Sequence, residues 1–499
     1  MECGCTHEGV RLSTAVRNIA ESELRGDARI AAVSVDSRQV RPGALFCAVP
    51  GTRQDGHLFV ADAVAAGANA LLVKRFVDAP VPQARVPSVR SAVGRVAAAV
   101  HGHPAEALAV AAVTGTNGKT TTVHLIDAVL AEAGYRTGLM STVETRIPGW
   151  WRPSSLTTPD AVEVQRTLCH MRAAGVQAAV IEVSSHAMDQ HRIDPVVADV
   201  AVFTNLSPEH LDYHGTIEQY YATKAMLFAP DRCRHAVVNI DDVWGRRLAA
   251  QAQVPITTVG STPRADIRID VVGARVVLHD SDGSVELPAR AGGRHATNLA
   301  AAYAAGRVLG ASRHEAVNGL AAAPPPGRWQ QVDLGQPFSV VVDFAHTPSA
   351  VADLIAEARA TSTGEVHLVI GCAGSRDRFN RPGMGRAALA ADTAILTTDD
   401  PYDEDPAQII AQMLTGTIGH TGGKLMVEHD RGQAIAAAVE RAMPGDVVLI
   451  AGRGHERYQT VNGTRHLFDD ADVATAVLTA QGWTPPAPPV RQPETSRGR

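Results

Sequence analysis

The sequence predicts an α/β protein with three domains, of which the central one is built on a mostly parallel sheet. Two observations lead to this fold class. The chain has 499 residues, which is too long for one hydrophobic core and suits about three domains. From about residue 105 onward, apolar segments such as 178–183, 200–204 and 236–239 alternate with helical patterns. This alternation is typical of parallel strands whose faces are covered by helices.

The N-terminal domain is expected over residues 1–104. It contains short strands and turns, for example the apolar segment 31–35. A helical pattern over 91–100 ends near His103-Pro104, and a proline after a helix marks a suitable domain boundary.

The central domain is expected over residues 105–330. It begins with an apolar strand at 109–113, a glycine-rich loop and a helix that includes 123–130. The segment 264–292 predicts a small antiparallel insertion, because its apolar residues alternate. The expected parts of this insertion are strands at 267–270 and 274–278 and a turn at Asp282-Gly283.

A third domain is expected over residues 331–483, after a stiff proline-rich linker at 323–327. It repeats the α/β pattern, with apolar segments at 339–342, 366–370, 393–396 and 447–451. The tail 484–499 holds five prolines and few apolar residues, so we expect it to be disordered.

Composition excludes several classes of protein. The formal net charge of −6 comes from well-mixed charges without a basic stripe, so nucleic acid is not an expected partner. No run of about 18 uncharged apolar residues exists, so we expect no membrane insertion. The polar, acidic N-terminus does not resemble a signal peptide. We therefore predict a cytoplasmic protein.

The six cysteines are scattered, which in a cytoplasmic chain favours reduced thiols without a shared role. Cys3 and Cys5 lie near His7, but no second ligand pair follows at the spacing of a zinc site.

The clearest motif is the glycine-rich segment 113–122, which lies between a predicted strand and a predicted helix. In this setting, unpaired backbone N–H groups at the start of the helix point at an anion. Lys119 would reach the terminal phosphates of a nucleotide, and the Thr120 hydroxyl would bind Mg²⁺. The residues expected to bind ATP here are Gly115, Thr116, Asn117, Gly118, Lys119, Thr120 and Thr121.

Three further residues lie near the ends of predicted strands or on a nearby helix. Glu182 ends a predicted strand and is placed to hold Mg²⁺, although an ordinary acid at a strand end would look the same. His210 follows another strand, where a histidine is more often a hydrogen-bonded loop residue. Lys224 lies in a helical segment and could equally be a solvated lysine.

Taken together, the segments 114–120, 182–186 and 205–210 and the helix around Lys224 resemble the Mur ligases. Further segments are similar to the MurE type of this family: 36–46 with 55–57, 157–159, 343–348, 381–385, 452–456 and 468–470. The resemblance runs in order from about residue 30 to residue 480.

The resemblance implies an ATP-dependent ligase that adds the third peptide residue to UDP-N-acetylmuramoyl-L-alanyl-D-glutamate in peptidoglycan precursor synthesis. It implies a UDP-binding N-terminal domain, a central P-loop ATPase domain and a Rossmann-like C-terminal domain. ATP would phosphorylate the substrate carboxylate to an acyl phosphate, which the incoming amine attacks. The expected partners are small molecules, and the chain is expected to be a monomer.

The resemblance also implies two Mg²⁺ ions and three catalytic residues, Lys119, His210 and Lys224. Thr120 and Glu182 would hold the first ion. His210 and Lys224 would hold the second, with Lys224 carbamylated by CO₂, because a lysine cation cannot bind a metal. Carbamylation needs a neutral amine and therefore a lowered pKa.

Further binding residues are implied by the same resemblance. ATP would also contact Asn298, Arg328, Asp343 and His346. The UDP-sugar peptide would contact Ser37, His57, Thr157, Thr158, Ser184 and Arg192, the last because a guanidinium pairs well with carboxylate or phosphate.

The site for the added amino acid departs from the pattern of the diaminopimelate-adding relatives. The residues implied there are Arg376, Asp399, Asp400, Tyr402, Gly452 and Glu456. Tyr402 stands where those relatives have an arginine that binds the distal carboxylate, and a phenol supplies no charge. Asp400 is an added acid. These two residues favour a basic amino acid such as lysine or ornithine, with diaminopimelate as the second choice.

Other interpretations remain open. Leu156 and the pair Trp329-Gln330 are smaller departures, which fit a relative in secondary metabolism with a different acceptor. The chain could also be another member of the same superfamily, such as a folylpolyglutamate synthase or a Mur ligase acting at another step. A non-catalytic ATP-binding relative is the alternative from a different class.

Overall fold

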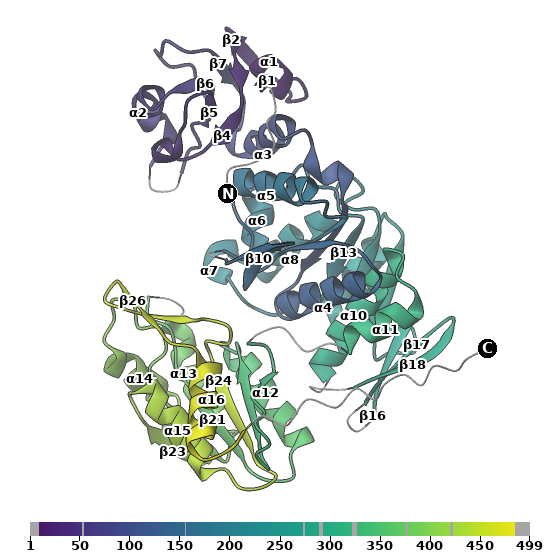
Figure 1. Ribbon diagram of the computed structural model, residues 1–499, viewed down its shortest axis with the longest axis vertical. Helices are drawn as coiled ribbons and strands as arrows, with labels where there is room; N and C mark the ends of the chain where they lie inside the picture. Colours follow the sequence, from purple (N-terminus) through teal and green to yellow (C-terminus); the bar gives the residue numbers. More distant parts are fainter. Residues whose placement is uncertain are drawn as a thin grey trace, which may run out of the picture. The chain divides into compact units, whose positions relative to one another are not determined.

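The computed structural model describes residues 9–51, 54–154, 156–272, 275–288, 293–321, 327–375, 378–419 and 423–484. The chain divides into two compact units, coloured purple to green and green to yellow in Figure 1. The first comprises Met1–Ala289 and Arg294–Ala323, and the second comprises Arg290–Gly293 and Pro324–Arg499. The predicted boundary at residue 330 is therefore too late. Gln330–Gln331 form a strand of the second unit, because they pair with its sheet.

The N-terminal part of the first unit has its own five-stranded sheet, in which four strands are parallel and one edge strand is antiparallel. The strand order is β2 (Glu23–Arg25), β7 (Gln83–Arg85), β6 (Ala68–Val73), β5 (Ala44–Cys47) and β4 (Ala32–Ser34). The short strands β1 (Val10–Arg11) and β3 (Arg29–Ile30) pair separately. The helical segments are α1 (Leu12–Ala15), η1 (Ser37–Gln39), η2 (Gly56–Phe59), α2 (Val60–Ala65), α3 (Val89–Val100) and η3 (Pro104–Ala107).

An eleven-stranded sheet forms the centre of the first unit. Its order is β11 (Trp150–Pro153), β10 (Glu144–Ile147), β9 (Thr137–Met140), β12 (Ala178–Glu182), β8 (Ala109–Thr114), β13 (Val200–Phe203), β14 (Ala236–Asn239), β15 (Ile256–Gly260), β16 (Ile267–Val272), β17 (Arg275–Asp280) and β18 (Gly283–Pro288). The strands from β9 to β16 are parallel, and antiparallel pairs extend both ends. The predicted insertion is thus antiparallel, as expected, but it continues the main sheet.

Helices cover both faces of this sheet because successive residues of a strand point to opposite faces. On β8, Ala111 and Val113 belong to one apolar core, and Val110 and Ala112 belong to the other. The helical segments of this part are α4 (Lys119–Glu132), α5 (Ala161–Ala173), α6 (Ser185–Asp189), α7 (Leu211–His214), α8 (Ile217–Ala225), η4 (Met226–Phe228), α9 (Val243–Gln251), α10 (Gly293–Val308) and α11 (Arg313–Leu320).

The second unit contains a six-stranded sheet that is parallel except at one edge. Its order is β19 (Gln330–Gln331), β20 (Ser339–Asp343), β24 (Val447–Ala451), β21 (Val366–Ile370), β22 (Thr393–Leu396) and β23 (Lys424–Val427). The hairpin β25 (Tyr458–Val461) and β26 (Thr464–Leu467) stands apart from this sheet. The helical segments are α12 (Pro348–Thr361), η5 (Arg378–Asn380), α13 (Arg381–Ala388), α14 (Pro406–Thr415), α15 (Arg431–Arg441) and α16 (Asp470–Ala480).

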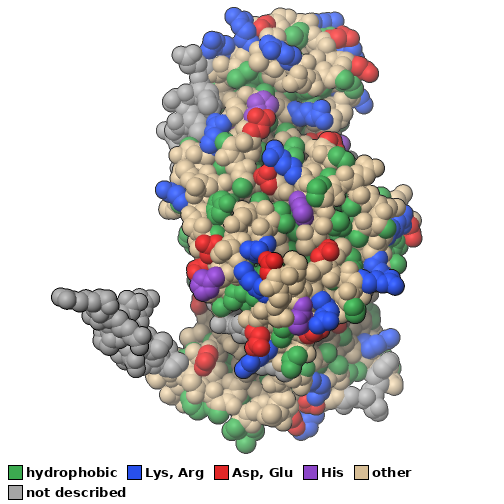
Figure 2. Space-filling model, turned by 90° about the vertical axis from the view of Figure 1, so that its right-hand side faces the viewer, with side chains coloured by type: hydrophobic (Ala, Val, Ile, Leu, Met, Phe, Trp, Pro, Cys, Tyr) green, Lys and Arg blue, Asp and Glu red, His purple; other side chains and the backbone are tan. Residues whose placement is uncertain are grey.

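The surface carries charged side chains of both signs (Figure 2). Basic and acidic side chains are interspersed over the face shown in Figure 2. Among the described residues, no helix is long and apolar enough to cross a membrane. Cys3, Cys5 and residues 485–499 of the predicted tail lie outside the described residues.

Candidate active site

The glycine-rich loop joins β8 to α4, as the sequence predicts. Gly115 and Gly118 both have positive φ, at 149° and 81°, a backbone conformation that glycine adopts without steric cost. The loop is also tightly enclosed. A Cβ at Gly115 would lie 1.9 Å from Thr204 Oγ1, and a Cβ at Gly118 would lie 2.3 Å from Asn298 Oδ1. Asn298, on α10, therefore lies against the loop.

Two lysines donate to carbonyl groups of this loop. Lys119 Nζ donates to Thr116 O at 2.8 Å, and Lys224 Nζ donates to Gly115 O at 2.8 Å. Lys224 is only 1% exposed. Burial, and then the nearby Lys119 ammonium group, hold the pKa of Lys224 well below its ordinary value. Lys224 is therefore a buried amine and not a solvated helix lysine.

The carboxylate of Glu182 faces the first turn of α4. Thr120 Oγ1 donates to it at 3.0 and 3.1 Å, and the backbone N–H of Thr142 donates to Oε2 at 2.8 Å. Glu182 is 1% exposed, which is unusual for an acid at a strand end. A carboxylate and a hydroxyl in contact are two oxygen donors of the kind Mg²⁺ prefers, so these residues fit the first predicted ion.

His210 lies at the start of α7, where its backbone adopts the left-handed conformation with φ of 55°. Its ring lies edge-on to that of His186, with 4.9 Å between centroids, and 6.4 Å from the ring of Tyr220. Burial, together with the neighbouring histidines, lowers the pKa of His186 to about 4. The His210 side chain itself is 45% exposed and is accessible to a ligand.

Two residues that hold the loop were absent from the predicted site. Asn205 Oδ1 accepts from the N–H of Asn117 at 2.9 Å, and Asn205 O accepts from the N–H of Thr116 at 2.8 Å. Tyr220 Oη lies 3.3 Å from Thr116 Oγ1. The first could have been found, because it belongs to the segment 205–210. Tyr220 carries no sequence signal beyond its position four residues before Lys224.

Several of the residues that were predicted to bind the substrate peptide form hydrogen bonds with one another at the end of β12. Thr158 Oγ1 donates to Glu182 O at 2.7 Å and accepts from the N–H of Ser184 at 3.1 Å. The Ser184 hydroxyl caps α6 by accepting from the N–H of Ala187. Arg192 Nη1 donates to Thr158 O at 2.7 Å. The structure thus brings this group together beside Glu182.

Thr157 joins the same network through a neighbouring side chain. Its hydroxyl accepts from Thr142 Oγ1 at 3.1 Å, and the backbone of Thr142 contacts Glu182. The predicted ATP and peptide sites are therefore continuous in the first unit.

The predicted UDP-binding residues lie in the N-terminal part. Ser37 begins η1, which Asp36 caps. His57 Nδ1 lies 2.6 Å from Asp55 Oδ1, and its Nε2 accepts from the N–H of Lys74 at 3.1 Å. Both ring nitrogens of His57 are thus engaged within the protein. The ring thereby holds the start of the loop after β6, and the contact of His57 with UDP stays a prediction.

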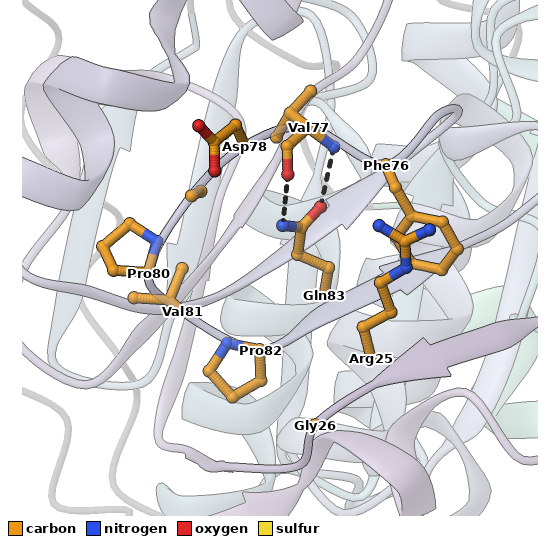
Figure 3. Close-up of a pocket in the computed structure, with 10 residues that line it drawn as sticks. Arg25, Gly26, Phe76, Val77, Asp78, Pro80, Val81, Pro82 and Gln83 are labelled. Atoms are coloured by element: carbon orange, nitrogen blue, oxygen red, sulfur yellow. Dashed lines mark hydrogen bonds between the residues drawn. The ribbon is translucent and has the colours of Figure 1, made fainter.

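That loop borders a hollow of 580 Å³, drawn in Figure 3. The Arg25 guanidinium lies 3.9 Å from the centroid of the Phe76 ring. The Gln83 amide exchanges two hydrogen bonds with the backbone of Val77, so this amide is already paired. The described residues that line the hollow include none of those predicted to bind a substrate.

In the second unit, the predicted ATP contacts gather around Phe344. The Arg328 guanidinium lies 4.5 Å and the His346 ring lies 4.7 Å from its ring centroid. Asp343 accepts from the N–H groups of Trp329 and Ala345 at 2.7 and 2.9 Å. Burial raises the pKa of Asp343, although the nearby Arg328 opposes that rise.

The predicted amino-acid site contains three neighbouring carboxylates. Each of Asp399, Asp400 and Glu456 has an oxygen within 4.8 Å of one on each of the others. Burial, followed by the charges of Asp399 and Asp400, raises the pKa of Glu456 to about 8. Gly452, with φ of 107°, lies beside Asp399, where a Cβ would come within 2.6 Å of its Oδ2.

Asp400 does not act as a free acid in this structure. The Arg453 guanidinium lies 3.3 Å from its Oδ1, and the N–H of Thr460 donates to the same oxygen. The argument that Asp400 favours a cationic amino acid is therefore weakened. Tyr402, with φ of 51°, is fixed by backbone hydrogen bonds with Thr460 and Asn462. The predicted residue Arg376 lies outside the described residues.

Comparison with known proteins gives the family. The model named "Mur ligase family, catalytic domain" matches residues 29–115, "Mur ligase middle domain" matches 113–306, and "Mur ligase, glutamate ligase domain" matches 327–454.

Individual relatives match more than nine-tenths of the chain. The UDP-N-acetylmuramoyl-L-alanyl-D-glutamate--2,6-diaminopimelate ligase of Streptomyces coelicolor is 44% identical over 479 residues, which cover 92% of this chain and 94% of that protein. The ligase of the same name from Aquifex aeolicus is 39% identical over 461 residues, covering 91% and 95%. A solved structure of a ligase with this name has a TM-score of 0.68 at 34% identity, covering 91% of this chain and 96% of that one. The chain therefore belongs to the Mur ligase family and is an ATP-dependent ligase.

Proposed function

We propose that this chain joins an amino acid to UDP-N-acetylmuramoyl-L-alanyl-D-glutamate, with ATP cleaved to ADP and phosphate, in peptidoglycan precursor synthesis. The observation that carries the proposal is the arrangement of Lys119, Thr120, Glu182 and Lys224 around one phosphate loop. A pseudoenzyme has no need for a buried lysine beside a buried carboxylate. The names and identities of the relatives support the choice of substrate.

In the first step, a carboxylate oxygen of the substrate attacks the γ-phosphorus of ATP, and ADP leaves. The backbone N–H groups of the loop bind the phosphates, and Lys119 transfers its hydrogen bonds from Thr116 O to phosphate oxygens. Thr120 and Glu182 would hold one Mg²⁺, with His210 and Lys224 holding a second. When bound, Mg²⁺ would lower the repulsion between the triphosphate and the carboxylate.

Lys224 would take part as a carbamate. Its buried amine, with a lowered pKa, can lose a proton and add CO₂, which produces an anionic oxygen ligand. In the second step, the amine of the added residue attacks the carbonyl carbon of the acyl phosphate. Phosphate leaves, the nitrogen loses a proton, and the amide forms. Closure of the site excludes water, which would hydrolyse the acyl phosphate.

The substrate peptide would lie beside Glu182, where Thr157, Thr158, Ser184 and Arg192 hold the end of β12. Ser37 and His57 remain the proposed contacts for UDP. We further propose that ATP contacts Asn298 and, from the second unit, Arg328, Asp343 and His346. The reaction is placed in the cytoplasm, where ATP is made, and the monomeric state stays a prediction.

For the added amino acid we propose diaminopimelate in place of lysine or ornithine. The relatives with 44% and 39% identity carry this substrate in their names. The pairing of Asp400 with Arg453 weakens one of the two reasons for a basic amino acid. The proposed binding residues are Arg376, Asp399, Asp400, Tyr402, Gly452 and Glu456.

Tyr402 supports a second candidate, a ligase of the same chemistry with a different acceptor in secondary metabolism. A phenol at this point supplies one hydrogen-bond donor and no positive charge for a distal carboxylate. The backbone of Tyr402 is held in place by its hydrogen bonds with Thr460 and Asn462.

One experiment tests both candidates. The purified chain is given ATP, Mg²⁺, UDP-N-acetylmuramoyl-L-alanyl-D-glutamate and either diaminopimelate, lysine or ornithine, and products are read by mass. We expect the diaminopimelate amide. A lysine or ornithine amide would restore the basic preference. Absence of product with all three, from protein that binds ATP, would contradict the proposal and favour a different acceptor.

A further inference from the structure

Tyr220 connects two parts of the candidate site. It lies on α8, is 1% exposed, and precedes Lys224 by about one helical turn, so the two side chains share a face of the helix. Lys224 Nζ lies 4.5 Å from the centroid of the Tyr220 ring. The hydroxyl at the other end of the ring lies 3.3 Å from Thr116 Oγ1, in the phosphate loop.

The direction of the second contact follows from the partners of Thr116. Its hydroxyl donates to Ser207 O at 3.2 Å and accepts from the N–H of Ser207 at 3.0 Å. A hydroxyl has one proton to donate, so Tyr220 Oη is the donor towards Thr116. The phenol therefore ties α8 to the phosphate loop and, through Thr116, to the loop that follows β13.

The ring also contacts more than the lysine. The His210 and His214 rings lie 6.4 and 5.1 Å from that of Tyr220, centroid to centroid. Tyr220 thus touches both residues proposed to hold the second Mg²⁺, Lys224 and His210. His214 lies on α7 and His210 directly precedes it; α7 contacts α8, as does α6, and Figure 1 labels all three helices.

We infer that Tyr220 is a positioning residue, whose ring sets where Lys224 Nζ lies and whose hydroxyl fixes that place relative to the phosphate loop. The Lys224 amine lies over the Tyr220 ring and donates a hydrogen bond to Gly115 O. Lys224 and Tyr220 thus join α8 to two adjacent residues of the loop, Gly115 and Thr116, and these two contacts together hold the helix against the loop. The effect on catalysis rests on the proposed function, whereas the geometry does not.

Tyr221 provides a matched control. It is the next residue on the same helix and is 3% exposed. Its hydroxyl donates to Gln251 Oε1 at 2.9 Å, and its ring lies 5.1 Å from that of Trp244. Tyr220→Phe and Tyr221→Phe therefore each remove one buried phenol hydrogen bond from α8, but only the first removes the contact with the phosphate loop.

The kinetic test compares these two variants in the full chain with the proposed substrates. For Tyr220→Phe we expect kcat to fall about tenfold, the effect of one lost positioning hydrogen bond, with KM for ATP changed less than about threefold. Tyr221→Phe should keep kcat within about twofold. Equal kcat values for the two variants would overturn the role of the hydroxyl.

A second test reads the position of Lys224 directly and needs no turnover. The chain has only four lysines, Lys74, Lys119, Lys224 and Lys424, so lysine labelled with ¹³C at Cε gives a simple NMR spectrum. The signal missing from Lys224→Arg identifies Lys224. Because protons over an aromatic ring are shielded, we expect this signal upfield of the others in the wild type and in Tyr220→Phe.

Loss of the ring in Tyr220→Leu should move this signal back towards the other lysines, with circular dichroism confirming the fold. A Lys224 signal that is not shifted upfield in the wild type would overturn the inference, even if Tyr220→Leu fails to fold. A wild type that makes no product would contradict the proposed function and leave the NMR result to decide the inference.

Discussion

Lys119 and Lys224 donate hydrogen bonds to consecutive carbonyl groups of the phosphate loop, Thr116 O and Gly115 O, each at 2.8 Å. Two ammonium groups this close to one another repel, and Lys224 is the buried one. The pair therefore divides its roles. In the proposed function, Lys119 would meet the phosphates, and Lys224, whose pKa is lowered, would supply the amine that loses a proton.

Lys119→Ala should abolish ATP turnover without unfolding the protein, because Lys119 is the first residue of α4 and its side chain is partly exposed. The measurement is ADP release with all substrates present, alongside circular dichroism. Lys424→Ala, which removes an exposed lysine of β23, should retain turnover. Normal ADP release from folded Lys119→Ala would remove the central part of the proposal.

Lys224→Ala should lose activity by a factor of about 100 or more, and short carboxylates such as acetate should restore part of it by replacing the carbamate oxygen. Product formation is measured at increasing acetate concentration. The same acetate should have no effect on Lys119→Ala, whose missing group is a cation. Full activity of Lys224→Ala without acetate would show that no carbamate is needed.

The phosphate loop and its flanking elements could be predicted from sequence because their signals are local. An apolar strand, two glycines that need positive φ and a helical pattern follow one another within 109–130, and β8 and α4 form there. The position of Glu182 beside the phosphate loop could also be predicted, since the ends of parallel strands meet at one edge of a sheet.

Contacts between distant segments could not be predicted in this way. The pairing of Asp400 with Arg453 joins two loops more than fifty residues apart. The hydrogen bond from the N–H of Lys74 to His57 Nε2 likewise forms only once the N-terminal sheet has folded. In the sequence, Tyr220 looks like an ordinary core residue of a helix. Only the packing of α8 against the phosphate loop turns its hydroxyl towards Thr116.

Gly118→Ala should weaken ATP binding, because a Cβ there would lie 2.3 Å from Asn298 Oδ1. Gly134→Ala is the matched control, since its φ of 85° is close to the 81° of Gly118 but nothing lies within 4 Å of its added Cβ. Both should lose about 1 kcal/mol of stability from backbone strain.

The two glycine variants should differ in nucleotide affinity, measured by calorimetry with a non-hydrolysable ATP analogue. Gly118→Ala should bind at least about tenfold more weakly, because a shift of the loop misplaces its N–H groups. Gly134→Ala should bind as the wild type does. Equal affinity of both variants would show that Asn298 yields without moving the loop.

Gln165→Met should stabilise the protein. Gln165 lies on α5, is 1% exposed, and among the described residues neither atom of its amide has a hydrogen-bond partner. An unpaired buried amide costs about 1–3 kcal/mol, and methionine has a similar volume without polar groups. Gln177→Met should instead destabilise, because Gln177 Oε1 accepts from the N–H of Arg136. Thermal unfolding of the full chain separates the two, and a lower Tm for Gln165→Met would indicate a bound water or other partner.

Glu456→Gln should change how stability depends on pH. In the folded protein the pKa of Glu456 is raised from 4.5 to about 8, by burial and by Asp399 and Asp400. Between these two values the folded state holds a proton that the unfolded state has lost, so the stability of the wild type falls as pH rises from about 4.5 to about 8. Glutamine does not titrate and lacks this loss.

The measurement is the Tm of Glu456→Gln minus that of the wild type, at pH 5.5 and at pH 8. We expect this difference to increase towards pH 8 by several degrees, because each unit of pKa shift corresponds to about 1.4 kcal/mol. Glu440→Gln, which changes an exposed acid on α15, should show no such trend. A difference that stays constant or decreases with pH would mean that Glu456 is ionised among its neighbours at neutral pH, and that Arg453 balances more of the cluster's charge than its single contact with Asp400 indicates.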